Sequence, residues 1–128
     1  MLKKNIPPKI IFRPLTKPEV EILLTIEEED TGPAGCFSCG DDKQDEELVN
    51  EIQFKLARGN LWAWCQVRIE VTWGGFNECQ YLGCCSYENE EDFKQHSGYY
   101  DQLVDEVIDN LNQNIKKVFD QLLLRAAN

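Results

Sequence analysis

Seven side chains in this sequence are suited to metal binding or nucleophilic chemistry: Cys36, Cys39, Cys65, Cys79, Cys84, Cys85 and His96. Their spacing is a poor framework for disulfides, because adjacent residues such as Cys84 and Cys85 point to opposite sides of a strand. Thiols stay free in a reducing cytosol, and free cysteine is among the most buried residue types. The main interpretation is therefore reduced, structural cysteines.

The Cys36-x-x-Cys39 pair leaves two alternatives open. It has the spacing of one half of a tetrahedral zinc site, whose other half would have to come from another cysteine or from His96. It is also the spacing of a redox dithiol, although it follows Gly and Pro and does not begin a helix after a strand, where a thiolate is stabilised. Neither alternative is favoured, and we expect no cofactor.

A second group of candidate residues belongs to a strand predicted over residues 61–73. Apolar residues occupy every second position of one face: Ala63, Cys65, Val67, Ile69, Val71 and Trp73. Because successive side chains of a strand point to opposite faces, Trp62, Trp64 and Arg68 are expected together on the other face. Indoles beside a guanidinium suit a planar ligand or a partner protein. In the alternative interpretation, the long helix covers this face and the tryptophans are core.

The segment His96-Ser97-Gly98-Tyr99-Tyr100 comes just before a long predicted helix. Free backbone N–H groups at a helix start favour an anion such as a phosphate. The alternative is that Ser97 is a helix cap and that the tyrosines are packing residues. The complete predicted ligand site consists of Trp62, Trp64, Arg68, Arg58, Tyr99 and Tyr100.

An α+β fold must position these residues. The alternation of apolar residues predicts a small antiparallel sheet, in which the central strand 61–73 forms a hairpin with residues 78–87 and is joined by a strand over residues 19–27. Helices are predicted over residues 42–58 and 98–126. Residues 48–58 also alternate as a strand would, and that alternative stays open. We expect one domain over residues 1–128, beginning with a proline-bearing arm over residues 1–18.

The long C-terminal helix predicts self-association. About 28 residues give a helix of about 42 Å, whereas a compact chain of this length is only about 36 Å across. Leu122, Leu123 and Leu124 span too wide an arc for one sheet to cover. We therefore predict a homo-oligomer through these leucines. The alternative is that the last turns pack on the N-terminal arm of the same chain.

Composition excludes several classes of function. No apolar run among the 128 residues approaches the length of a membrane span, and no apolar segment of a secretory leader follows the first lysines, so we expect a cytoplasmic protein without a membrane partner. The net charge of −10 repels duplex nucleic acid. The sequence has one histidine and no catalytic motif of the common hydrolase, nucleotidase or zinc-protease types. We therefore do not expect an enzyme.

Four strings carry a resemblance to a known group of proteins. They are Arg58-Gly59-Asn60-Leu61-Trp62-Ala63-Trp64-Cys65, Tyr81-Leu82-Gly83-Cys84-Cys85-Ser86-Tyr87, Glu91-Asp92-Phe93 and Gly98-Tyr99-Tyr100-Asp101. Over about residues 25–110 the chain resembles small proteins common in phages, prophages and plasmids. This resemblance implies a mobile-element accessory protein in a bacterial cytoplasm. Small proteins of that kind are often inhibitors of host defence.

Three functions are compatible with that resemblance. The leading hypothesis is sequestration of a nucleotide-derived defence signal, as by anti-Thoeris proteins, with the predicted aromatic and cationic residues as the site. The second is inhibition of a basic host effector, as by many anti-CRISPR proteins, through the acidic runs 27–30, 41–47 and 88–92. The third is a virion or packaging accessory role.

Overall fold

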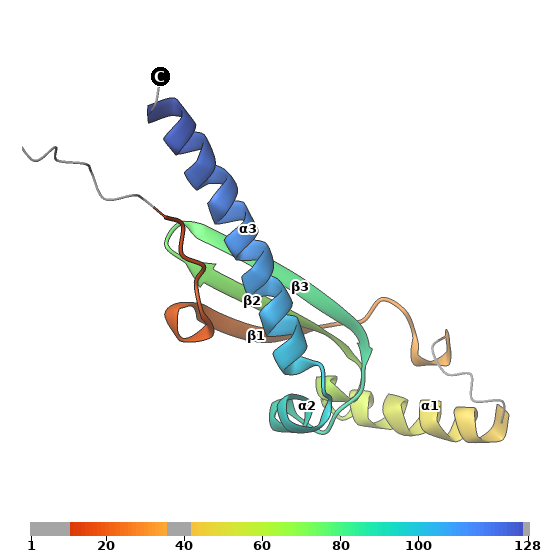
Figure 1. Cartoon of the computed structure of the whole chain (residues 1–128). Helices are drawn as coiled ribbons and strands as arrows, with labels where there is room; N and C mark the ends of the chain where they lie inside the picture. Colours follow the sequence, from red (N-terminus) through yellow and green to blue (C-terminus); the bar gives the residue numbers. More distant parts are fainter. Residues whose placement is uncertain (1–10, 36–41, 127–128) are drawn as a thin grey trace, which may run out of the picture.

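The computed structural model describes residues 11–35 and 42–126. The chain forms a three-stranded antiparallel sheet with three α-helices, and the predicted α+β fold is confirmed (Figure 1). The strands pair in the order β1-β2-β3, and they are β1 (Glu21–Glu27), β2 (Cys65–Trp73) and β3 (Phe76–Cys85). The helices are α1 (Asp42–Ala57), α2 (Glu90–His96) and α3 (Tyr100–Ala126). Short 3-10 turns are η1 (Lys17–Glu19), η2 (Pro33–Gly35) and η3 (Leu61–Ala63).

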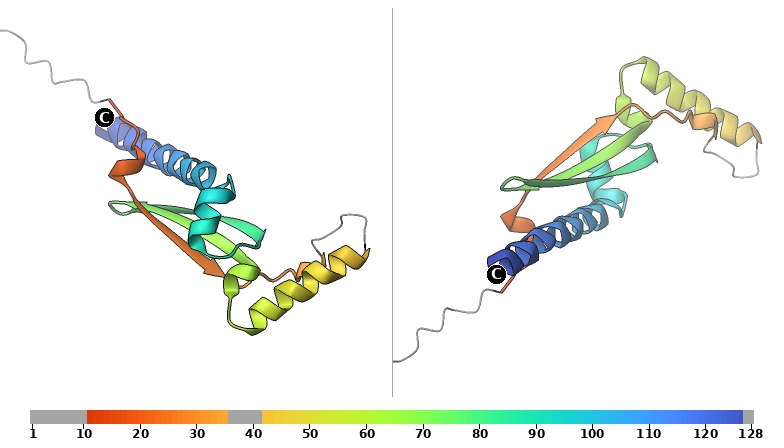
Figure 2. Two further views of the ribbon diagram at one scale, coloured as in Figure 1. Left: turned by 90° about the horizontal axis from the view of Figure 1, so that it is seen from below. Right: turned by 90° about the horizontal axis from the view of Figure 1, so that it is seen from above.

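The hydrophobic core lies between α3 and one face of the sheet (Figure 2). Along β2 the buried side chains alternate with partly exposed ones, as the sequence predicts. The fully buried residues of β2 meet fully buried residues of α3, spaced three and four apart: Cys65, Val67, Ile69 and Val71 against Val104, Val107 and Leu111. Burying each such side chain contributes about 1.5–3 kcal/mol, so this layer is the main source of stability.

The opposite face of the sheet is more open to solvent. Arg68 lies there, paired with Glu70 at 2.9 Å and accompanied by Tyr81, whose hydroxyl accepts a hydrogen bond from the guanidinium. Leu23 of β1 also belongs to this face, since it pairs with Glu70 in the register of the sheet, and it is largely exposed. Leu23 interrupts the alternation of apolar and polar residues along β1, and its side chain does not take part in the core.

The end of α1 has the hydrogen bonds of a Schellman motif. The backbone N–H of Asn60 donates to Lys55 O, and that of Gly59 donates to Leu56 O. Gly59 has a φ of 88°, a conformation that favours glycine. This is the helix end that Arg58-Gly59 indicates, and the helix alternative for residues 48–58 is confirmed. The helix projects from the sheet, and its main contacts are with η2 and η3 (Figures 1 and 2).

Helix α2 was not expected from the sequence, where residues 88–92 were interpreted as part of an acidic loop. Asn89 is its N-cap and accepts a hydrogen bond from the backbone N–H of Asp92. In return, the Asp92 carboxylate accepts from the N–H of Glu88. The helix exists because this reciprocal cap satisfies its first turn and because Phe93 is fully buried. The sequence signal for this helix start is an N-cap residue, Asn89, followed three positions later by Asp92.

The N-terminal arm and the last turns of α3 are in contact. The Phe12 and Phe119 rings lie 5.9 Å apart, and the Asn112 side chain both donates to and accepts from the backbone of Leu15. Beyond these contacts α3 continues past the hairpin turn of β2 and β3 (Figure 1). Leu122 and Leu124 remain 61% and 69% exposed. None of the described helices is both long and apolar enough to cross a membrane.

We expect Leu111→Ala to lower the free energy of unfolding by about 2–5 kcal/mol, because it leaves a cavity between α3 and β2. Leu124→Ala is the matched control on the same helix, since it removes the same atoms from an exposed position and should cost no more than about 0.5 kcal/mol. Urea denaturation followed by circular dichroism measures both. Equal losses in the two variants would contradict this placement of the core.

Candidate functional site

The structure places Trp62, Trp64 and Arg68 in three different surroundings, not in one site as predicted. The predicted strand over residues 61–73 begins only at Cys65, because residues 61–63 form the 3-10 turn η3. A turn of this kind breaks the two-residue alternation, so the parity of β2 does not extend back to Trp62, whereas Trp64 follows the turn in extended backbone directly before Cys65. The flanking strands also differ slightly from the predicted ranges 19–27 and 78–87, since β1 begins two residues later and β3 begins and ends two residues earlier.

Trp62 packs against the core on the side of α2. Its ring centroid lies 5.8 Å from that of Phe93, and its backbone carbonyl accepts a hydrogen bond from the N–H of Tyr87. Trp62 therefore helps to join η3 to the segment that follows β3. The alternative interpretation of this tryptophan as a packing residue fits these contacts.

Trp64 is 5% exposed, yet it borders two hollows. Its indole N–H donates to the carbonyl of Thr31 at 2.8 Å. One hollow, of about 280 Å³, lies toward Leu56 and Glu28. The other, of about 420 Å³, is lined by the turn after β3 and by Tyr99, which is 49% exposed. Of the six predicted ligand residues, Trp64 and Tyr99 are the two that line one pocket.

The remaining predicted site residues lie apart from that pocket. The Arg58 guanidinium lies 4.5 Å from the centroid of the Phe54 ring, on α1. Arg68 lies on the open face of the sheet with Glu70. Tyr100 packs edge-on against Phe93, with ring centroids 6.3 Å apart. The aromatic and cationic groups thus form several small clusters, because α1, β2 and α3 carry them to different parts of the molecule.

Glu29, which the sequence analysis placed only within the acidic run 27–30, lines the hollow of about 280 Å³ and contacts the end of β3. Glu29 accepts a hydrogen bond from the backbone N–H of Cys84 at 2.9 Å. Cys84 has a φ of 55°, and the pairing of β2 with β3 shifts register here, as in a β-bulge. A side chain at Gly83 would place its Cβ 3.0 Å from the Glu29 carboxylate. The loop after β1 and the end of β3 are therefore fitted to each other.

The polar groups of the segment before α3 bond to one another and to the end of α2. Ser97 Oγ accepts a hydrogen bond from the backbone N–H of Tyr99, and His96 Nδ1 lies 2.9 Å from the Asp92 carboxylate. The bond from the Glu88 N–H, together with His96, lowers the pKa of Asp92. A negative group thus stands beside the predicted anion site. Ser97 accepts from the N–H of Tyr99, the residue before α3, and not from an N–H within that helix.

The cysteines differ in exposure and in acidity. Burial raises the pKa of Cys65 to about 12 and that of Cys85 to about 11. Both thiols therefore stay protonated at neutral pH and are poor nucleophiles. Cys79 and Cys84 are exposed, and Cys36 and Cys39 lie outside the described residues, so the zinc and dithiol alternatives stay untested. In the part of the chain that the structure describes, no three His, Cys, Asp or Glu side chains form a group that could hold a metal.

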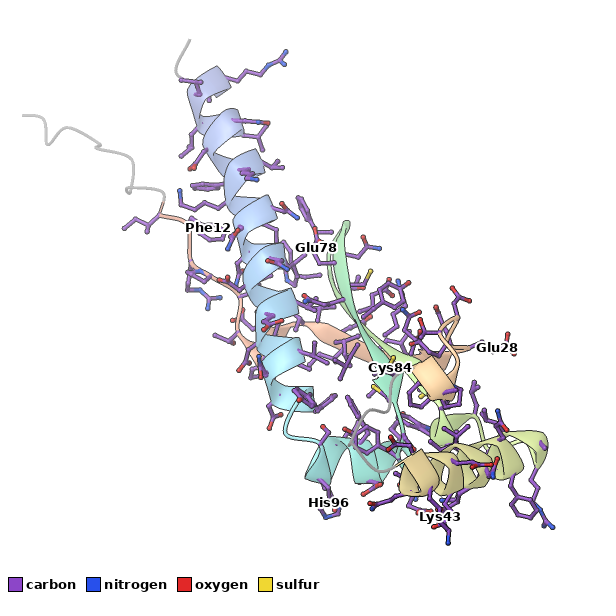
Figure 3. All side chains as sticks on the ribbon, turned by 90° about the vertical axis from the view of Figure 1, so that its right-hand side faces the viewer. Phe12, Glu28, Lys43, Glu78, Cys84 and His96 are labelled. Carbon is purple, nitrogen blue, oxygen red and sulfur yellow. The ribbon has the colours of Figure 1, made fainter. Side chains whose placement is uncertain are left out.

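The negative charge gathers at one end of the molecule, which we call the acidic end: residues 27–30, helix α1 and residues 88–92. Residues 27–58 contain ten Asp or Glu and three Lys or Arg, and residues 88–96 contain four and one. The rest of the chain has nine of each sign, so these two segments account for the whole net charge of −10. Lys55 joins them by its contacts with Glu51 and Glu88. Figure 3 shows Glu28, Lys43 and His96 at this end.

Comparison with known proteins adds no assignment: no family model, no curated protein and no solved structure matches the chain.

We expect iodoacetamide to modify Cys79 in the folded protein while Cys65 and Cys85 stay unmodified until denaturant is added. The pH of the labelling reaction is then raised from 7 to 9. The two buried thiols should not respond, since pKa values of about 12 and about 11 keep them protonated. Peptide mass mapping measures the sites, and early modification of Cys65 would contradict its burial.

Proposed function

We propose that this protein is a non-catalytic binding protein that docks its acidic end on a basic surface of a partner protein. The observation that supports this proposal is the excess of carboxylates at that end, where the described residues of 27–58 and 88–96 include thirteen Asp or Glu and four Lys or Arg. A surface of one sign steers a partner of opposite sign and disfavours wrong partners. In the setting that the resemblance to mobile-element proteins implies, the partner is an effector of bacterial defence.

Helix α1 is suited to the contact itself. It projects from the sheet, and Ile52 is its only buried apolar side chain within the described residues. Phe54 is 59% exposed, and Leu48 is also exposed. Protein interfaces commonly combine a central apolar or aromatic anchor with a charged rim. On α1, Phe54 supplies the anchor.

The carboxylates of the acidic end are available for such a contact. Glu46 and Glu47 are exposed on α1, and Glu28 and Asp30 are exposed on the loop after β1. In the described part of the chain, none of these four is in an ion pair. A basic partner would therefore meet carboxylates without having to displace a cation of this chain.

Reversing two charges of the acidic end should weaken binding of a basic probe. The probe is a short fluorescein-labelled peptide rich in Arg and Lys, and fluorescence anisotropy measures its dissociation constant. We expect E46K/E47K to raise that constant about tenfold or more, because like charges are then placed opposite each other. Added salt should weaken binding to the unmodified protein, as it does for exposed charges.

The matched control is D105K/D109K on α3. It changes the net charge by the same amount, at two exposed positions outside the acidic end. A smaller loss in this control supports docking through the acidic end. Equal losses in both double variants would mean that the peptide responds only to overall charge, and would refute the proposal. Circular dichroism checks that both variants remain folded.

Sequestration of a nucleotide-derived signal is the second candidate function. One observation favours it: Trp64 and Tyr99 line the same pocket of about 420 Å³, where a planar base could stack on the exposed Tyr99 ring. No Lys or Arg is among the described residues that line this pocket. The phosphate groups of a nucleotide would therefore lack a cation there, and the acidic interaction ranks above this candidate.

Thermal shift against cyclic dinucleotides and cyclic ADP-ribose derivatives tests the second candidate. A ligand that binds only the folded state raises the melting temperature by mass action. If the pocket is the site, Tyr99→Ala should abolish the shift while leaving the unliganded melting temperature nearly unchanged, since Tyr99 is half exposed. Arg68→Ala, on the open face of the sheet, is the control and should retain the shift. No shift with any nucleotide would eliminate this function.

Three further parts of the proposal rest on the sequence. The cytoplasm as its location and the origin in a mobile element follow from the resemblance. A virion or packaging accessory role is the third candidate function. Self-association through the C-terminal leucines fits their exposure.

A further inference from the structure

The end of the molecule opposite the acidic end is apolar. The residues of this apolar end are Ile11, Trp73, Val118, Leu122, Leu123 and Leu124, all of which are exposed. They come from the arm, from the hairpin turn and from the last turns of α3. Figure 3 shows Phe12 and Glu78 along the same half of α3, far from Lys43 and His96. Contiguous exposed apolar surface on a protein marks an interaction site.

One stripe of α3 leads from the core into this apolar end. Leu111, Ile115, Val118 and Leu122 follow one another at spacings of four, three and four, so at 100° per residue they lie within an arc of about 60°. Exposure increases along the stripe: Leu111 is fully buried, whereas Val118 is 38% and Leu122 is 61% exposed. The face of α3 that packs on the sheet therefore continues beyond the edge of the sheet, where no described residue covers it. This spacing is that of a coiled-coil seam.

We propose that the apolar end is a homodimer interface in which the last turns of two α3 helices pack antiparallel. A twofold axis near residue 120 would place Val118 of each chain against Leu122 of the other, and the reverse contact follows by symmetry. The seam then continues the packing that Leu111 and Ile115 make within the subunit. Trp73, at the hairpin turn, borders the same surface.

Charge identifies a second copy of this chain as the occupant. Around the apolar end the cations and carboxylates cancel: Arg13, Lys116, Lys117 and Arg125 against Glu19, Glu21, Glu78 and Asp120. Any contact between two acidic ends would be repelled. In the antiparallel pair, the two residues 100 would lie about 60 Å apart along the helices, several times the Debye length of about 10 Å at 0.1 M salt. A tail-to-tail dimer thus keeps the like charges apart.

The dimer would carry its two acidic ends at opposite poles. Where the proposed docking function holds, such an arrangement is bivalent and would gain affinity for a partner with repeated basic surfaces. The interface itself does not depend on that function. Because few side chains form the seam, we expect a reversible dimer of micromolar strength.

Sedimentation velocity of the full chain between about 1 and 500 µM tests the proposal. We expect the mass to rise with concentration from 14.8 kDa to about twice that value. Salt between about 0.05 and 0.5 M should leave the dimer intact or strengthen it, because salt screens the repulsion between the acidic ends. A monomer at every concentration would overturn the proposal, and so would dissociation by salt.

Two variants locate the interface. Leu122→Glu places a charge in the seam at an exposed position, so it should shift the protein to monomer without loss of helical circular dichroism. Asn110→Glu adds the same charge to an exposed position of α3 outside the seam, and it should remain dimeric. A dimer that survives Leu122→Glu uses another surface, which would refute the proposed interface. Binding of the basic peptide to monomeric Leu122→Glu shows separately whether the acidic end still functions.

Discussion

The packing of α3 on β2 is the interaction on which the rest of the structure depends. Four residues of β2 and three of α3 are fully buried against one another, and they form the centre of the hydrophobic core. Their positions fix which face of the sheet is open and which side of α3 points to solvent. They also fix where the two ends of the molecule lie, because α2 precedes α3 directly and the arm runs along its second half.

Around this layer the chain separates two kinds of surface. Carboxylates gather where α1, α2 and the loop after β1 meet, and apolar side chains gather where α3 leaves the sheet. Neither surface contributes to the core, and an excess of like charge costs stability through self-repulsion. Their separation suits a protein that binds others with one end and its own copy with the other.

The predicted ligand site illustrates how a local departure from regular structure changes a functional inference. Extending the parity of β2 by four residues placed two indoles beside Arg68. The 3-10 turn η3 instead places Trp62 against Phe93, and the loop after β1 covers Trp64 through the Thr31 carbonyl. Trp64 and Tyr99 do meet at one pocket, although they are 35 positions apart. The contact of Glu29 with the end of β3 was not predicted, because its hydrogen bond with Cys84 depends on a bulge in β3 that the sequence pattern does not encode.

The sequence by itself determined the elements whose signals are local. Alternation defined β2 from Cys65 onward, spacings of three and four defined α3, and Arg58-Gly59 marked the end of α1. These features depend on side-chain periodicity and on backbone conformation within a few residues. Tertiary structure alone decided which residues became neighbours across the chain: the fit of Glu29 to Gly83, the contact of Phe12 with Phe119, and the gathering of acidic segments at one end. Such contacts join residues far apart in the sequence, and only the path of the folded chain brings them together.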